Sequence, residues 1–263
     1  MNRKNKRNSS LFYEKKLFSF YLKKRILSIV FILCILLSLV LAFTSFLSSS
    51  IEENISRLNV DSVVFWQDFL GIFSLLIFPL YFPIIISADI VSGEFSNRSA
   101  LIIYSMESRT KILFIKLVSL ITSIFILNLF YFLTFLLIVF IKTGIFISIH
   151  IFLIGFLIIF LESMFISSIT FMISTLTQNT FVSFILPFSY ISIAPFLGFF
   201  ELDLFSYNFY KMKVSSFFEY FLFNEQIIFS IINTISIIIF FGLPILIMLI
   251  TFYGFKQLDI RME

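Results

Sequence analysis

Long apolar runs separated by short polar segments dominate the chain. Six runs reach the roughly 20 residues that a helix needs to cross a hydrocarbon core. They cover residues 26–47, 69–88, 112–141, 151–173, 181–200 and 227–252. Each run is expected to be helical, because backbone groups in lipid need hydrogen-bond partners within their own segment. The pattern predicts an all-α integral membrane protein with six transmembrane helices.

A basic segment, residues 1–25, precedes the first run and holds nine of the 19 Lys and Arg residues. Within residues 10–24, apolar side chains fall along one helical side and most lysines lie opposite. The apolar side comprises Leu11, Leu17, Phe18, Tyr21 and Leu22. This pattern predicts an amphipathic helix that lies in the headgroup plane. A signal peptide is disfavoured, because the basic region is too long and the next run has spanning length.

The basic residues also predict the orientation of the chain. With the N-terminus inside, the cytoplasmic segments hold 15 Lys and Arg residues and the outer segments hold four, which together account for all 19. Cytoplasmic loops carry such an excess. We expect a multi-pass protein of the plasma membrane, with residues 1–25 and the tail 253–263 in the cytoplasm and 26–252 as the membrane domain.

Composition excludes several classes of protein. The chain is 60% hydrophobic with a mean hydropathy of +1.07, which a soluble domain of 263 residues cannot bury. Cys34 is the only cysteine, so an intrachain disulfide and a cysteine-based metal site are excluded. The sequence has no phosphate-binding loop and no metalloprotease or serine-hydrolase motif. We expect no catalytic residues, no metal site and no nucleic-acid partner.

The polar stretch at 89–111 is the most informative segment between two runs. It mixes acidic and basic residues around an apolar patch, which consists of Leu101, Ile102, Ile103 and Tyr104. Glu94 lies in the turn-prone part before the patch, and Arg109 follows it. One interpretation is a docking surface for another protein. The other is a solvated loop whose basic residues only fix the topology.

Proline and one acid mark candidate pathway residues inside the runs. Pro79 and Pro83 lie in the second run, and Pro187 and Pro195 in the fifth. Membrane helices tolerate proline where a neighbouring helix or a cavity satisfies the freed carbonyl groups, although such kinks also serve packing alone. Glu162 lies near the middle of the fourth run, where a carboxylate either makes a structural hydrogen bond or handles a substrate or ion.

The chain resembles the permease subunits of ABC-2-type exporters. The likeness lies in the six runs, the basic N-terminus and the segment Ser92-Gly93-Glu94-Phe95, which is followed by the apolar patch, Arg109 and Lys116. The C-terminal residues 255–260, in which a basic residue precedes Asp-Ile, also resemble the family. The chain departs from it at Ser105 and Glu107, where family members commonly carry proline.

This resemblance implies a subunit that does not hydrolyse ATP itself. A separate ATPase would bind ATP and Mg²⁺, and a second, identical or related permease would complete the transporter. The segment around Glu94, the apolar patch and Arg109 would form the coupling helix that docks on the ATPase. The second and fifth runs would face each other across the dimer. The alternatives are a non-transporting scaffold or sensor, and an ion-coupled transporter that uses Glu162.

Overall fold

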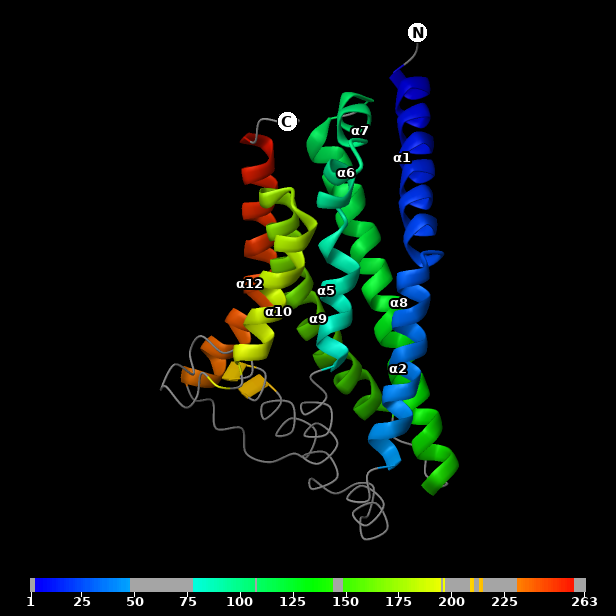
Figure 1. The fold of residues 1–263 in the computed structure, drawn as a ribbon, viewed down its shortest axis with the longest axis vertical. Helices are drawn as coiled ribbons and strands as arrows, with labels where there is room; N and C mark the ends of the chain where they lie inside the picture. The colour runs from blue at the N-terminus through cyan, green and yellow to red at the C-terminus, as the bar shows by residue number, and fades with distance from the viewer. Residues whose placement is uncertain are drawn as a thin grey trace.

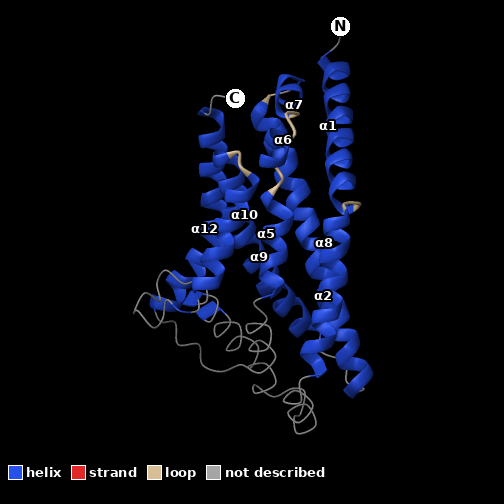
Figure 2. Ribbon diagram, viewed as in Figure 1, coloured by secondary structure: helices blue, strands red, loops and turns tan. Residues whose placement is uncertain are grey.

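The computed structural model describes residues 3–47, 78–106, 108–143, 149–194, 196, 209–210, 213–214 and 231–257. Within these ranges the chain is helical and contains no strand (Figure 2). Three helical stretches, Arg109–Ile138, Gly155–Thr177 and Thr234–Gln257, are long and apolar enough to cross a membrane. The prediction of an all-α chain is therefore confirmed, and these three helices are those of a membrane protein.

Helices occupy all six predicted runs where the structure describes them. They are α2 (Ile29–Leu47), α5 (Phe78–Ala88), α8 (Arg109–Thr143), α9 (Ile149–Thr177), α10 (Thr180–Ile193) and α12 (Ile231–Gln257). Six complete spans stay a prediction, because the structure does not describe residues 69–77 of the second run, 195 and 197–200 of the fifth, and 227–230 of the sixth. Helix α12 extends five residues beyond the predicted end of the sixth run.

Helix α9 lies at the centre of the bundle and packs against α5, α8, α10 and α12 (Figure 1). At one end of the bundle lie the start of α1 (Arg3–Ile26), the end of α12 and two short helices. These are α6 (Ser92–Ser96) and α7 (Ala100–Met106). The predicted topology places these segments together on the cytoplasmic side, and the bundle brings them to one end.

Helix α1 packs lengthwise along α8 instead of ending at the bundle surface. Tyr21 is buried, and Lys111 of α8 forms an ion pair with Glu14 at 3.1 Å. The chain turns at Ser28, whose hydroxyl accepts a hydrogen bond from the Phe31 N–H at 3.2 Å and so caps the start of α2. The amphipathic pattern is explained by packing on α8, and a position in the headgroup plane stays a prediction.

Candidate functional site

The centre of the candidate site is a buried ion pair between Glu94 of α6 and Lys116 of α8. The side chain of Glu94 is 5% exposed and that of Lys116 is fully buried. A buried charge is costly unless an opposite charge and hydrogen bonds compensate it. The pair therefore fixes the short helix α6 against the first turns of α8, 22 residues further along the chain.

Tyr104 of α7 completes the surroundings of the Lys116 ammonium group. Lys116 Nζ donates a hydrogen bond to Tyr104 Oη at 3.1 Å, and it lies 5.2 Å from the Tyr104 ring centre and 5.6 Å from that of Tyr21. Cations over aromatic faces are attracted by the ring quadrupole. Burial, and next the charge of Glu94, raise the pKa of the Tyr104 phenol, which keeps it neutral.

The turn between α6 and α7 brings Tyr104 back towards Lys116. Arg98 adopts φ 56°, a left-handed conformation that ends α6 and that most side chains disfavour. The Ser99 N–H donates to the Glu94 carbonyl at 2.9 Å and closes this turn. The Tyr104 ring then packs edge-on against Phe255 of α12, with 5.3 Å between ring centres. Helix α7 thus contacts both α8 and α12.

A second polar cluster joins α6 to α9 and α10. The Ser174 hydroxyl donates to the Ala88 carbonyl at 2.8 Å and accepts from the Ser92 N–H at 3.1 Å. Thr180, at the start of α10, donates to the Ser92 hydroxyl at 3.1 Å. Ser92 and Ser174 are fully buried. The Ser92 N–H, just beyond the end of α5, gains its acceptor from Ser174, while the Ala88 carbonyl also accepts from the Ser92 hydroxyl at 2.7 Å.

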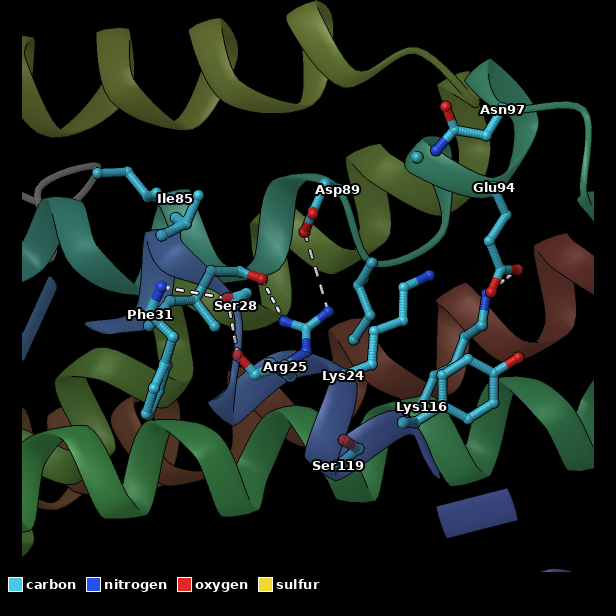
Figure 3. A pocket seen from close by; sticks show the side chains of 15 residues that line it. Lys24, Arg25, Ser28, Phe31, Ile85, Asp89, Glu94, Asn97, Lys116 and Ser119 are labelled. Atoms are coloured by element: carbon cyan, nitrogen blue, oxygen red, sulfur yellow. Dashed lines mark hydrogen bonds and ion pairs between the residues drawn. The ribbon is translucent and has the colours of Figure 1, made fainter. Parts of the chain in front are cut away.

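A cavity of about 200 Å³ opens beside the ion pair, between α1, α2, α5, α6 and α8 (Figure 3). Arg25 lies across it and donates to the Ile86 carbonyl, and its guanidinium is 3.9 Å from the carboxylate of Asp89. Burial lowers the pKa of Arg25, while Asp89 and Glu94 oppose this shift. Lys24 and Ser119 also line the cavity.

The residues predicted for docking lie in three helices, α6, α7 and the start of α8, and differ in exposure. Ile102 is 66% exposed, while Ile103 and Arg109 are half-buried. Leu101 lies in α7, but its side chain is outside the described residues. Glu94 is buried in its ion pair with Lys116. It therefore does not lie on the outer surface, where its charge would orient a docking partner. The predicted segment is two helices and a turn instead of a solvated loop.

The predicted pathway residues lie in helices that contact each other. Pro83 of α5 and Pro187 of α10 are both buried. Tyr81 joins these two helices, with 3.2 Å between its hydroxyl and that of Ser192. The Pro79 side chain and Pro195 lie outside the described residues. The structure thus brings the described parts of the second and fifth runs together within one chain.

Glu162 is buried in α9 but does not line the cavity beside Lys116. Its neighbour Ser163 donates to the Asn128 side-chain oxygen of α8 at 3.3 Å. In the described part of the chain, no three His, Cys, Asp or Glu side chains gather as metal ligands. The described residues therefore offer polar contacts between helices at this level, without a recognisable metal centre.

Sequence reasoning identified Glu94 and Lys116 separately but did not pair them. The signal was the position of Lys116 among apolar residues of the third run, since a lysine in such surroundings needs a buried counter-charge. Ser92 and Ser174 carried no comparable signal. Their partners are backbone groups and hydroxyls that only the packing of α6 on α9 and α10 brings together.

Comparison with known proteins assigns no family. No family model matches the chain, and no curated protein matches it significantly.

Proposed function

We propose that the chain is the permease subunit of an ABC-2-type exporter, energised by a separate ATPase that docks on α7. One observation carries the proposal. Helix α7 presents exposed Ile102 outwards, while its other side contacts α8 and α12 through Tyr104. An element that is exposed on one side and fixed to long apolar helices on the other is suited to transmit a partner's movement.

The polar contacts define how such movement would reach the helices. Glu94 connects α6 to α8 through Lys116, and Ser92 connects α6 to α9 through Ser174. Close-packed interiors transmit displacement because they yield little to compression. In this proposal Glu94 acts as a coupling residue inside the protein, and Ile102 acts as the docking residue on its surface.

ATP and Mg²⁺ would bind to the partner ATPase, and a second permease would complete the assembly. The pathway would involve α5 and α10, which carry the buried prolines Pro83 and Pro187. A proline inside a helix leaves one backbone carbonyl without its intrahelical partner and bends the helix. Membrane proteins tolerate such bends where a neighbouring helix or a cavity satisfies the carbonyl.

Purification of the tagged full-length chain from its native membrane in a mild detergent tests this function. We expect a protein with a phosphate-binding loop to co-purify in stoichiometric amount, and the complex to hydrolyse ATP. A scaffold or an ion-coupled transporter predicts no ATPase in the preparation. Intact chain that is recovered without any ATPase, under conditions that preserve other membrane complexes, contradicts the proposal.

A further inference from the structure

The cavity beside Lys116 contains more positive than negative groups. Its lining includes three cations, Lys24, Arg25 and Lys116, and two carboxylates, Asp89 and Glu94. Lys116 is paired with Glu94, and Arg25 lies beside Asp89. Among the described residues, the Lys24 ammonium group has neither an ion pair nor a hydrogen bond. The uncompensated charge favours an anion in the cavity.

Ser119 gives an independent indication of a ligand. Its side chain projects from α8 to the cavity (Figure 3), the residue is 1% exposed, and Oγ has no hydrogen-bond partner among the described residues. Buried hydroxyl groups are normally hydrogen-bonded, so an orphan hydroxyl in a cavity indicates a missing partner. The cavity of about 200 Å³ exceeds the roughly 15 Å³ that one water molecule needs.

We propose that this cavity binds a phosphate group, with Lys24 and Arg25 supplying positive charge and Ser119 donating a hydrogen bond. Arginine has five N–H donors, so the Arg25 guanidinium can hold Ile86 and Asp89 and still donate to phosphate oxygens. The phosphate belongs either to a phospholipid headgroup or to a free phosphate ion. This site is separate from the exposed face of α7 and does not depend on the proposed ATPase.

The surroundings of the cavity suit a lipid headgroup. Val30 lines the cavity, and the neighbouring apolar side chains of Leu27 and Ile29 are more than two-thirds exposed. Acyl chains could run along this face of α2 while the headgroup enters between α1 and α8. Basic pockets between membrane helices are known to hold anionic headgroups. A free phosphate would use the same polar groups without acyl chains along α2.

Thermal unfolding of the purified, delipidated full-length chain tests the site. Three ligands are added separately, namely dioctanoyl phosphatidylglycerol, dioctanoyl phosphatidylcholine and sodium phosphate. Sodium chloride of equal ionic strength is the control for sodium phosphate. A ligand that binds only the folded state raises Tm. A rise with phosphatidylglycerol beyond that with phosphatidylcholine, but none with phosphate, identifies the headgroup. A rise with sodium phosphate as well identifies free phosphate as sufficient.

Two variants with matched controls locate the binding. Lys24→Gln is expected to raise the ligand concentration that gives the half-maximal Tm shift about tenfold. This factor corresponds to the loss of one charged hydrogen bond. Lys23→Gln removes the same charge from the same turn but not from the cavity lining, and should change it less than about twofold. Both lysines are exposed, so both variants should fold.

Ser119→Ala should weaken binding without lowering Tm in the absence of ligand, because the hydroxyl has no partner to lose. Ser123→Ala, one turn further along α8, removes a hydroxyl that bonds its own helix at 2.8 Å and should leave binding unchanged. The proposal is overturned if no addition raises Tm, or if Lys23→Gln and Lys24→Gln weaken binding equally. The first result would mean a water-filled cavity, and the second a diffuse surface charge.

Discussion

At the scale of single residues, the Glu94–Lys116 pair determines how α6 and α7 sit on α8. A buried pair adds little net stability, since the desolvation of both charges offsets their attraction. Its effect is specific, because each side chain can be buried only while the other is present. Lys116 also holds Tyr104 through a 3.1 Å hydrogen bond, so the pair positions both short helices.

We predict that Glu94→Gln and Lys116→Met each lower the free energy of unfolding by about 3–5 kcal/mol, because each leaves an uncompensated buried charge. The double variant should cost much less than the sum of the two, since neither charge remains. Denaturant unfolding in detergent micelles measures all three. Additive costs would show that the two side chains do not depend on each other.

At the scale of elements, the turn at Arg98 joins α6 and α7 into one unit, and a serine contact fixes this unit to α9. Arg98 is exposed and adopts the left-handed backbone conformation. A substitution at this position therefore acts on stability through the backbone conformation and not through side-chain packing. Ser174 joins this unit to α9 by accepting the Ser92 N–H. The turn at Arg98 and the contact of Ser174 can each be altered by a substitution that leaves the apolar faces of the long helices unchanged.

Arg98→Gly is expected to raise the free energy of unfolding by up to about 1 kcal/mol, because glycine adopts positive φ without steric cost. Arg98→Val should lower the free energy of unfolding by about 1–2 kcal/mol, because a β-branched side chain disfavours positive φ. Chemical denaturation of the two variants measures the difference. If valine is tolerated as well as glycine, the turn between α6 and α7 does not have this conformation.

Ser174→Ala should cost about 1–3 kcal/mol of stability, because the buried Ser92 N–H loses its acceptor. Ser168→Ala is the matched control on the same helix, since among the described residues the Ser168 hydroxyl bonds only the Phe165 carbonyl of α9. Its cost should stay below about 1 kcal/mol. Equal costs in denaturant unfolding would mean that the contact between α6 and α9 contributes nothing specific.

At the scale of the whole molecule, the bundle places α6, α7 and the described chain ends together (Figure 1). The start of α10 lies there as well, since Thr180 contacts Ser92. The excess of basic residues predicts that this end faces the cytoplasm. The protein would then offer one cytoplasmic face that contains the exposed side of α7.

Cysteine labelling in intact cells tests this orientation, with Cys34 replaced by alanine in every variant. Asn97→Cys is expected to react only after the membrane is permeabilised. Asn54→Cys and Asn208→Cys, in segments outside the described residues, should react with an impermeant reagent from outside. Protection of Asn208→Cys in intact cells would contradict the six-span topology.

The sequence allowed the helices to be predicted but not their contacts. Apolar runs locate α8, α9 and α12 to within a few residues, because the length and polarity of each run are local properties. The pairing of Glu94 with Lys116 depends on a turn at Arg98 and on the packing of α6, which no local pattern encodes. The apolar patch was found as a unit, yet packing separates exposed Ile102 from buried Tyr104.

Co-purification of the ATPase with the Ile102→Asp variant tests whether α7 is the docking surface. Buried apolar anchors carry most of the energy of an interface, so this change should weaken docking by more than about 2 kcal/mol, or roughly 30-fold. Ser108→Asp adds the same charge at an exposed position outside the patch and should retain the ATPase. Both variants should insert and unfold like the wild type, because neither side chain is buried. If Ile102→Asp retains its ATPase in full amount and with full ATP hydrolysis, α7 is not the docking surface.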